Sequence, residues 1–84
     1  YPNPFNPETT IKYQVKADTD VKLEVFNIKG QKVKTLVNDF VTEGDYVAKW
    51  NGTDDNDQSV SSGVYFYKLR SGKETQTKKM VLLQ

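Results

Sequence analysis

The sequence predicts an all-β fold, a small antiparallel β-sandwich of six to seven strands. Apolar and polar residues alternate with a period of two along most of the 84-residue chain, and no stretch keeps the 3.6-residue period of a helix. Turn-forming residues recur about every 8–12 residues, which is typical of such sandwiches. All three prolines fall within the first seven residues, so none interrupts the pairing of strands.

Three strands are expected in the first half of the chain. Residues 9–15 and 21–26 both carry apolar side chains at every second position. Gly30 can adopt the positive φ that a tight hairpin requires, so residues 31–37 are expected to pair with residues 21–26. The pair Asn38-Asp39 is expected to end this third strand.

The second half of the chain predicts three more strands. Residues 46–50 alternate, and a long polar loop follows in residues 51–63. Residues 64–70 are apolar on both faces, which predicts a central strand that is covered on two sides. Residues 75–83 form the last predicted strand, which has a polar first half and an apolar end.

The composition excludes several kinds of chemistry. The chain has no cysteine and no histidine, which excludes disulfides, thiolate nucleophiles, Cys/His zinc sites and imidazole bases. Its net charge of +1 argues against an electrostatic grip on nucleic acid. Its apolar runs are far shorter than the roughly 20 residues that span a bilayer. The opening residues lack an initiator Met and a signal-peptide layout, so the chain is expected to be a segment of a longer protein.

Acidic residues offer two candidate sites. Segment 54–57 contains three Asp residues that could hold a hard cation such as Ca²⁺, yet the EF-hand positions that need Gly and Glu hold Ser59 and Tyr65. A solvated loop with Asx turns is the preferred interpretation. A carboxylate pair for glycoside hydrolysis, in this loop or at Glu43 and Asp45, would need a partly buried acid, which a polar loop seldom provides. Enzymatic activity is therefore not expected.

The aromatic residues admit two interpretations. A row of exposed rings could stack on sugars in a carbohydrate-binding module, but most of these residues occupy alternating positions that a sandwich core must fill. Trp50, at the end of a predicted strand, is expected to plug the core. Tyr65 or Tyr67 is expected to be a corner tyrosine, whose hydroxyl bonds back to the backbone.

Lysines form two clusters, one at Lys29, Lys32 and Lys34 and one at Lys78 and Lys79. They are expected to solvate an outer face and to discourage edge-to-edge pairing of strands. A basic strip for an acidic polysaccharide or a lipid headgroup is the alternative. Aromatic residues of the kind that stack single-stranded bases do not surround them, so nucleic-acid binding is not expected.

Five motifs, in order along the chain, resemble those of the C-terminal sorting domains of the bacterial type IX secretion system. They are residues 1–7 (YPNPFNP), 26–31 (FNIKGQ), 50–54 (WNGTD), 62–69 (SGVYFYKL) and 78–83 (KKMVLL). The middle of the chain also resembles the immunoglobulin-like domain of flagellar hook-capping proteins. Two departures stand out: the usual Trp-Asp-Gly step reads Trp50-Asn51-Gly52, and a turn that often carries Asn-Gly reads Asn56-Asp57.

The resemblance implies a single immunoglobulin-like β-sandwich over residues 1–84, with residues 1–8 as a docking arm, at the C-terminus of a larger secreted protein. The parent would carry upstream catalytic or binding domains and enter the periplasm of a Gram-negative bacterium. The type IX translocon would then recognise this domain and pass the parent across the outer membrane to the cell surface or the medium. A sortase-like protease commonly removes such a domain.

The resemblance also implies which residues matter for recognition by the translocon. They are Pro2, Asn3, Pro4, Gly63, Tyr65, Lys79, Met80 and Val81. Physical reasoning supports part of this set, because Gly63 has no Cβ and therefore permits a sharp entry into the apolar strand at residues 64–70. The last strand has the apolar side chains of a segment that a partner could capture by strand addition.

The sequence therefore predicts a non-catalytic sorting domain that needs no cofactor and no metal. A carbohydrate-binding module beside a glycoside hydrolase is one alternative, and a purely structural immunoglobulin-like accessory module is another. Exposed rings that bind polysaccharide would favour the first alternative, and an internal position in the parent would favour the second.

Overall fold

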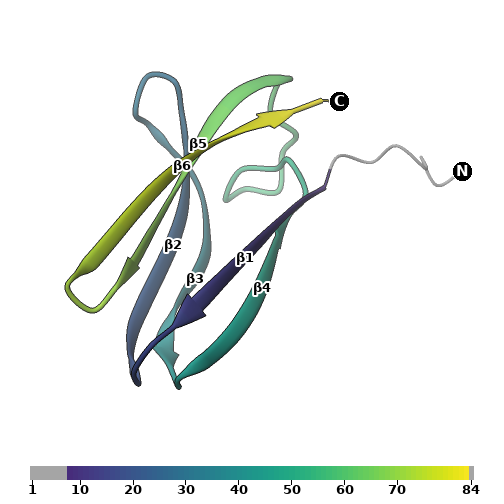
Figure 1. Ribbon diagram of the computed structural model, residues 1–84. Helices are drawn as coiled ribbons and strands as arrows, with labels where there is room; N and C mark the ends of the chain where they lie inside the picture. Colours follow the sequence, from purple (N-terminus) through teal and green to yellow (C-terminus); the bar gives the residue numbers. More distant parts are fainter. Residues whose placement is uncertain (1–7, 84) are drawn as a thin grey trace, which may run out of the picture.

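The structure is a computed structural model that describes residues 8–83, and in that range it consists of six β-strands in two antiparallel sheets (Figure 1). The strands are β1 (Thr9–Val15), β2 (Thr19–Asn27), β3 (Lys32–Val41), β4 (Gly44–Trp50), β5 (Gly63–Ser71) and β6 (Glu74–Leu82). β1 and β4 form a two-stranded sheet, and the other strands form a four-stranded sheet in the order β3-β2-β5-β6. The predicted antiparallel sandwich is confirmed.

The core lies between the two sheets, and it is built from alternating positions of their strands. Each strand turns every second side chain inward because successive side chains point to opposite faces. The buried side chains are Ile11, Val15, Val21, Leu23, Val25, Trp50, Tyr65, Leu69, Met80 and Leu82. The apolar residues that alternate in the sequence are therefore the ones that alternate into the core. Trp50 has no exposed surface and fills the core, as predicted.

The turn between β2 and β3 follows the prediction. Gly30 has φ +80° and donates its N–H to the carbonyl oxygen of Asn27 at 3.0 Å. The Asn27 side chain accepts hydrogen bonds from the backbone N–H groups of Lys29 and Gln31. An Asn side chain that bonds its own turn stabilises the reversal locally.

The expected end of β3 at Asn38-Asp39 is wrong. β3 continues to Val41, and Asp39 and Phe40 pair with Val21 and Asp20 of β2. Two register shifts let the ten residues of β3 follow the nine of β2. The pairing satisfies backbone donors and acceptors, which outweighs the poor intrinsic strand preference of Asn and Asp.

β5 is a central strand, as predicted, but only one of its faces is covered. Tyr65 and Leu69 point into the core, whereas Val64, Lys68 and Arg70 are exposed on the other face. The two-stranded sheet packs on one side of the four-stranded sheet, and no second layer of the described residues covers the opposite side (Figure 1).

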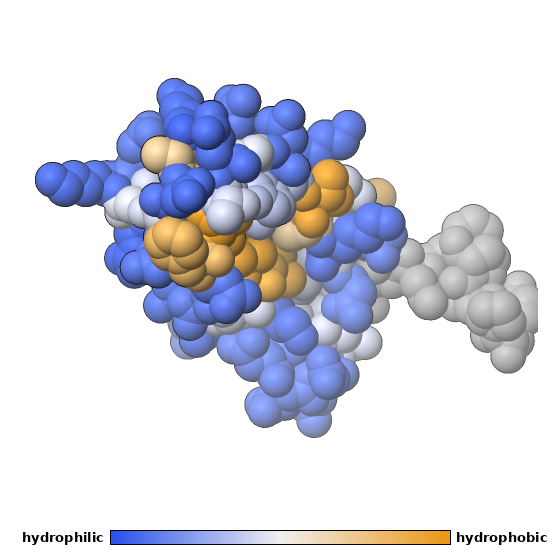
Figure 2. Space-filling view, turned by 90° about the horizontal axis from the view of Figure 1, so that it is seen from below, coloured by the Kyte–Doolittle hydropathy of each residue, from blue (hydrophilic) through white to orange (hydrophobic). Residues whose placement is uncertain are grey.

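The two-stranded sheet is also too narrow to cover all of β6. The residues of β6 that precede Met80 are exposed on both faces of the strand. Beside them lies a groove of about 720 Å³ between the end of β1 and the β5–β6 turn, with Leu69 in its lining. Figure 2 looks onto this end of the sandwich and shows apolar side chains surrounded by polar ones.

Candidate functional site

Five of the eight candidate recognition residues meet on one hairpin, β5–β6. Gly63 and Tyr65 lie at the start of β5, and the register pairs Tyr65 directly with Met80. Lys79 and Val81 flank Met80 on β6. The hairpin thus brings together two motifs, residues 62–69 and 78–83, that eight residues separate in the sequence. The other three candidates, Pro2, Asn3 and Pro4, lie outside the described residues, as does most of the expected docking arm.

The alternation of side chains divides these candidates between two faces of the sheet. Tyr65 and Met80 are 6% and 9% exposed and belong to the core. Lys79 and Val81 point the other way and are exposed, Val81 by 56%. A partner can therefore touch Lys79 and Val81 directly, whereas Tyr65 and Met80 act on such a contact only by holding the hairpin in place.

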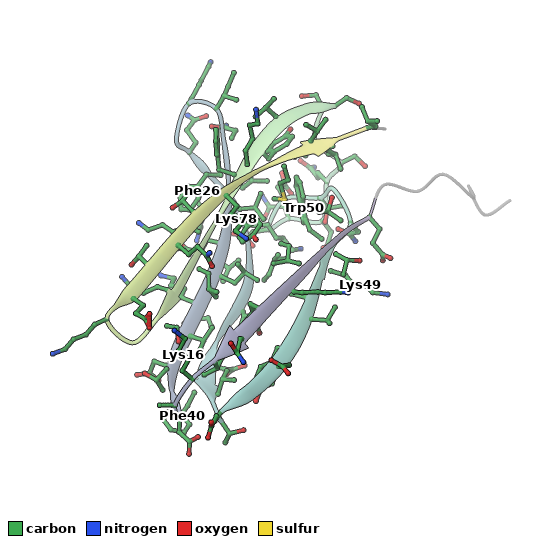
Figure 3. All side chains as sticks on the ribbon, in the orientation of Figure 1. Lys16, Phe26, Phe40, Lys49, Trp50 and Lys78 are labelled. Carbon is green, nitrogen blue, oxygen red and sulfur yellow. The ribbon has the colours of Figure 1, made fainter. Side chains whose placement is uncertain are left out.

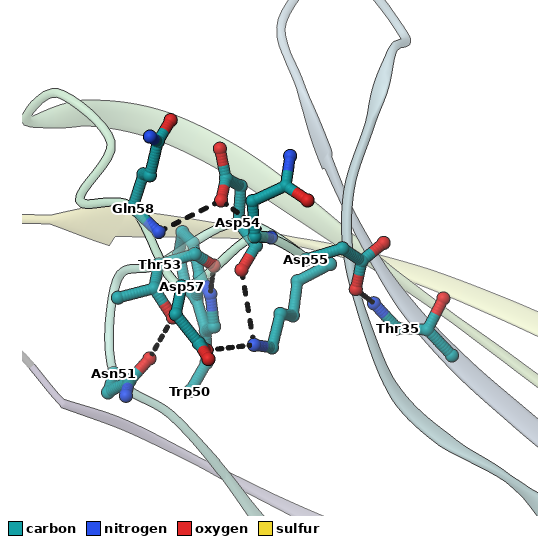
Figure 4. A network of polar contacts seen from close by, with 10 residues as sticks. Thr35, Trp50, Asn51, Thr53, Asp54, Asp55, Asp57 and Gln58 are labelled. Atoms are coloured by element: carbon teal, nitrogen blue, oxygen red, sulfur yellow. Dashed lines mark hydrogen bonds and ion pairs between the residues drawn. The ribbon is translucent and has the colours of Figure 1, made fainter.

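Tyr65 is held by two specific contacts. Its hydroxyl donates a hydrogen bond to the carbonyl oxygen of Ser61 at 2.7 Å, which confirms the expected corner tyrosine. Its ring lies edge-on to Trp50, with 5.0 Å between the ring centroids and 68° between the planes. The Trp50 indole N–H in turn donates to the carbonyl oxygen of Thr53 at 2.8 Å (Figure 4). Tyr65 thus connects the start of β5 to the loop before it and to the core.

Gly63 begins β5 with φ +149°, in a region that side-chain-bearing residues rarely adopt. A Cβ placed there would meet no atom within 4 Å. Glycine is therefore required at this position because of the backbone angle and not because of crowding. The sequence likewise explains Gly63 by the backbone at the entry to β5.

The acidic segment 54–57 is organised by hydrogen bonds of its own (Figure 4). The Asp54 carboxylate accepts the backbone N–H groups of Asn56 and Gln58, at 2.9 and 3.0 Å. Asp57 adopts a positive φ of 61° and lies 3.2 Å from the Lys34 ammonium. These contacts confirm the Asx-turn interpretation of the loop.

The same segment docks against the outer edge of β3. Asp55 donates its backbone N–H to the carbonyl oxygen of Val33 and accepts the N–H of Thr35 on its carboxylate, both at 3.0 Å. The carboxylate also lies 3.8 Å from the Lys32 ammonium. The loop therefore occupies backbone groups of an edge strand that would otherwise be open to another chain.

The alternative chemistries weighed from the sequence, a metal site and a carboxylate pair, find little support in residues 8–83. No group of three or more acidic residues there is arranged to hold a metal ion. Glu43 and Asp45 are exposed, and no charged residue of the described range is buried. Residues 8–83 contain no helix with the length and apolar character that crossing a membrane requires.

The aromatic side chains are mainly interior. Trp50 and Tyr65 are buried, and the rings of Tyr13 and Tyr46 stack with 5.6 Å between their centroids while packing against the core. Burial and the neighbouring Tyr46 raise the pKa of Tyr13 above its usual value of 10. The exceptions among the described residues are Phe26 and Phe66, which are partly buried on the uncovered side of the four-stranded sheet, and Phe40, which is 65% exposed at the end of the sandwich (Figure 3).

Sequence reasoning missed three apolar neighbours of Lys79 and Val81. Val64 pairs with Val81, and Phe66 lies between Phe26 on β2 and Lys79 on β6. The expected cover over both faces of β5 had assigned Val64 and Phe66 to the interior. The sequence did contain one indication of an apolar outer face. Phe26 directly follows Val25, so it points to the side opposite the buried alternating residues of its own strand.

Comparison with known proteins bears on the function of this hairpin. The sequence profile of a family described as secretion system C-terminal sorting domain matches residues 1–83. No curated protein and no solved structure matched the chain. Domains of this family are non-catalytic signals that mark proteins for type IX secretion, and those proteins end up secreted or on the surface of Gram-negative bacteria. Because the match covers nearly the whole sequence, the chain belongs to the family of C-terminal sorting domains that direct proteins to the type IX secretion system.

Proposed function

We propose that the type IX translocon recognises this domain through the β5–β6 hairpin. In this proposal Lys79 and Val81 contact the translocon, while Gly63, Tyr65 and Met80 fix the position of the hairpin. Pro2, Asn3 and Pro4 contribute from the opening segment, as the resemblance implies. The domain spans residues 1–84, catalyses no reaction, and is carried by a larger secreted protein with catalytic or binding domains upstream.

The observation that carries the proposal is the combination of exposed side chains and an open strand edge on β6. Lys79 and Val81 are exposed although they belong to segment 78–83, one of the five motifs through which the sequence resembles the family. β6 is the last strand of its sheet, so within the described residues its second edge pairs with no strand. Unpaired backbone groups beside exposed side chains are the features that a partner uses in strand addition.

The proposal is tested with residues 1–84 fused to the C-terminus of a reporter enzyme that has its own periplasmic signal. In cells with a type IX system we expect the reporter at the surface or in the medium. Removing the chain from Lys78 onward should leave the reporter in the periplasm. Normal surface delivery of the truncated fusion would refute the proposal.

Because this truncation also removes the buried residues Met80 and Leu82, a milder pair of variants is needed. Val81→Asp should block delivery, and Val47→Asp should not, because Val47 is equally exposed (58%) but lies on the two-stranded sheet. Thermal melts of both purified domains establish that they remain folded. Equal delivery of the two variants would contradict a role for the β6 surface.

We further propose that a sortase-like protease removes the domain after export. A fusion with one epitope before the domain and a second epitope after Gln84 separates the two products. We expect surface material that keeps the first epitope and has lost the second, together with a decrease in mass close to the 9.6 kDa of the domain. Surface fusions that retain both epitopes would count against cleavage.

A further inference from the structure

The uncovered side of the four-stranded sheet, here called the outer face, combines apolar pairs with cationic side chains. Residues that pair directly across antiparallel strands point to the same side, so the register defines this face. Its apolar side chains are Phe26 and Phe66, which are cross-strand partners, and the neighbouring pair Val64 and Val81. Phe40 adds an exposed ring at the other end of the face, opposite Asp20.

Cations outnumber acids on this face. The cationic residues are Lys22, Lys32, Lys68, Arg70 and Lys79, and the acidic ones are Asp20 and Glu24. The chain as a whole has nearly equal numbers of the two, 12 Lys and Arg against 11 Asp and Glu. The described remainder of the molecule is therefore net acidic, and the positive charge is concentrated on the outer face.

Three of these cations are available to a partner. Lys22 lies 3.6 Å from Glu24, and Lys32 lies 3.8 Å from Asp55. For Lys68, Arg70 and Lys79, no carboxylate of residues 8–83 lies within ion-pair distance. Lys79 follows the apolar pair Val64 and Val81 along the hairpin, and Lys68 and Arg70 continue the same face toward the other end of β5.

The dimensions of the face suit a small protein interface. At about 3.3 Å per residue along a strand and about 4.8 Å between strands, it measures about 20 Å by about 15 Å. This corresponds to the weak, transient class of interface, below about 1,200 Å² of total buried area. Transient contact is the behaviour that a sorting signal needs, because the signal must be released after delivery.

We propose that the outer face docks onto a protein surface of the translocon that has an apolar patch with carboxylates beside it. This inference rests on the proposed function and adds to it the chemistry of the partner and the participation of β2 and β5. The cationic residues steer the approach and set the orientation, and the apolar pairs exclude water from the part of the contact that they cover.

The arrangement favours a protein over a lipid surface. A segment that binds a bilayer buries its apolar side chains about 5–10 Å into the headgroup region. Phe26 and Phe66 are partly buried within the sheet, and they lie on the outer face between Lys32 and Lys79. Rings that are already partly buried within a sheet meet a complementary protein surface more readily than they enter a membrane.

The test compares two charge-reversal pairs. Lys68→Glu with Arg70→Glu alters the outer face, and Lys12→Glu with Lys49→Glu alters the exposed side of the two-stranded sheet by the same charge. The unaltered domain, fused to the reporter, is bound to detergent-solubilised translocon. We expect the first pair to weaken binding about tenfold or more and the second pair to change it less than about twofold.

The salt dependence of binding and the effect of an apolar-to-polar substitution test the charged and apolar parts of the outer face separately. Binding of the unaltered domain should weaken as NaCl rises from about 0.05 to about 0.5 M, because salt screens exposed charges. Val64→Thr with Val81→Thr preserves shape and should also weaken binding, whereas Val47→Thr should not. Thermal melts of each variant separate lost binding from lost folding.

Several results would overturn the inference. These are equal effects of the two charge-reversal pairs, binding to vesicles of lipopolysaccharide in place of the translocon, or self-association of the domain through the outer face. If the reporter is delivered by the unaltered domain and blocked by Val81→Asp, but Lys68→Glu with Arg70→Glu has no effect, the inference fails while the proposed function stands. Failure of delivery by the unaltered domain would instead reject the proposed function.

Discussion

Tyr65 illustrates how a single side chain connects the core with the surface that a partner reads. Its ring packs against Trp50, and its hydroxyl is bonded to the backbone of Ser61 four residues earlier. Because it pairs with Met80 across the strands, any displacement of Tyr65 also displaces the exposed neighbours Lys79 and Val81. A buried residue can therefore be important for recognition without being touched.

Tyr65→Phe separates the two contacts of this residue. The substitution keeps the ring and removes the hydroxyl, so the carbonyl oxygen of Ser61 loses its donor. We expect the free energy of unfolding to fall by about 1 kcal/mol, as measured by urea denaturation. Delivery of a fused reporter should persist, because the exposed side chains are unchanged. Loss of delivery with unchanged stability would point to a direct contact of the hydroxyl.

Gly63→Ala tests the backbone angle at the start of β5. Alanine at φ +149° is strained, so we expect a loss of about 1–3 kcal/mol in urea denaturation. Gly30→Ala is a useful comparison, because φ +80° there is closer to the left-handed region that other residues occupy at lower cost. A smaller loss at Gly63 than at Gly30 would argue against the strain.

We expect Tyr13 to make the folded domain less stable at alkaline pH. Burial, together with Tyr46, raises the pKa of Tyr13 above 10, so the folded state holds this proton more tightly than the unfolded chain does. The resulting stability is present in full below pH 10 and is lost as the pH rises through the folded-state pKa. In thermal melts above pH 10, Tyr13→Phe should lose less stability than the unaltered domain. Parallel losses would exclude Tyr13 as the cause.

At the scale of elements, the loop between β4 and β5 serves as a cover for β3. An edge strand with open backbone groups is a template for unwanted pairing. Here Asp55 bonds two of these groups, and Asp54 and Asp57 shape the loop that presents it. The acidic residues that suggested a metal site in the sequence thus have a structural use in the fold.

Asp55→Ala should expose this edge. We expect a loss of about 1 kcal/mol in stability and faster amide hydrogen exchange at Thr35, whose acceptor is removed. Asp45→Ala, an exposed carboxylate on β4, is the matched control and should leave both quantities unchanged. Unaltered exchange at Thr35 in the Asp55 variant would show that the loop does not hold the edge.

At the scale of the whole molecule, the one-sided packing and the unequal widths of the two sheets determine which surfaces remain open. The two-stranded sheet packs on one side of the four-stranded sheet, so the other side of β5 stays exposed, and because two strands face four, much of β6 stays exposed as well. Met80→Ala should cost about 2–5 kcal/mol in urea denaturation, because Met80 lies where the sheets overlap. Lys78→Ala, two residues earlier on the same face of β6, should change stability by less than about 0.5 kcal/mol. Similar losses for both would contradict partial cover of β6.

The sequence by itself determined the strands and their inward residues, because alternation is a local property of each strand. It also indicated the β2–β3 turn through Gly30, the core position of Trp50, and the family through motifs in order. It did not determine that β3 continues past Asn38, since pairing with β2 outweighs local preference there.

Only the tertiary structure decided how the strands other than the β2–β3 pair became neighbours, and which faces the second sheet left uncovered. These outcomes depend on how all six strands pack together, and no local pattern encodes them. The exposure of Val64 and Lys79 beside Phe66, and the docking of Asp55 on β3, follow from that packing. The same apolar alternation therefore supplies the core on one side of the sheet and, on the other, the surface that we propose a partner reads.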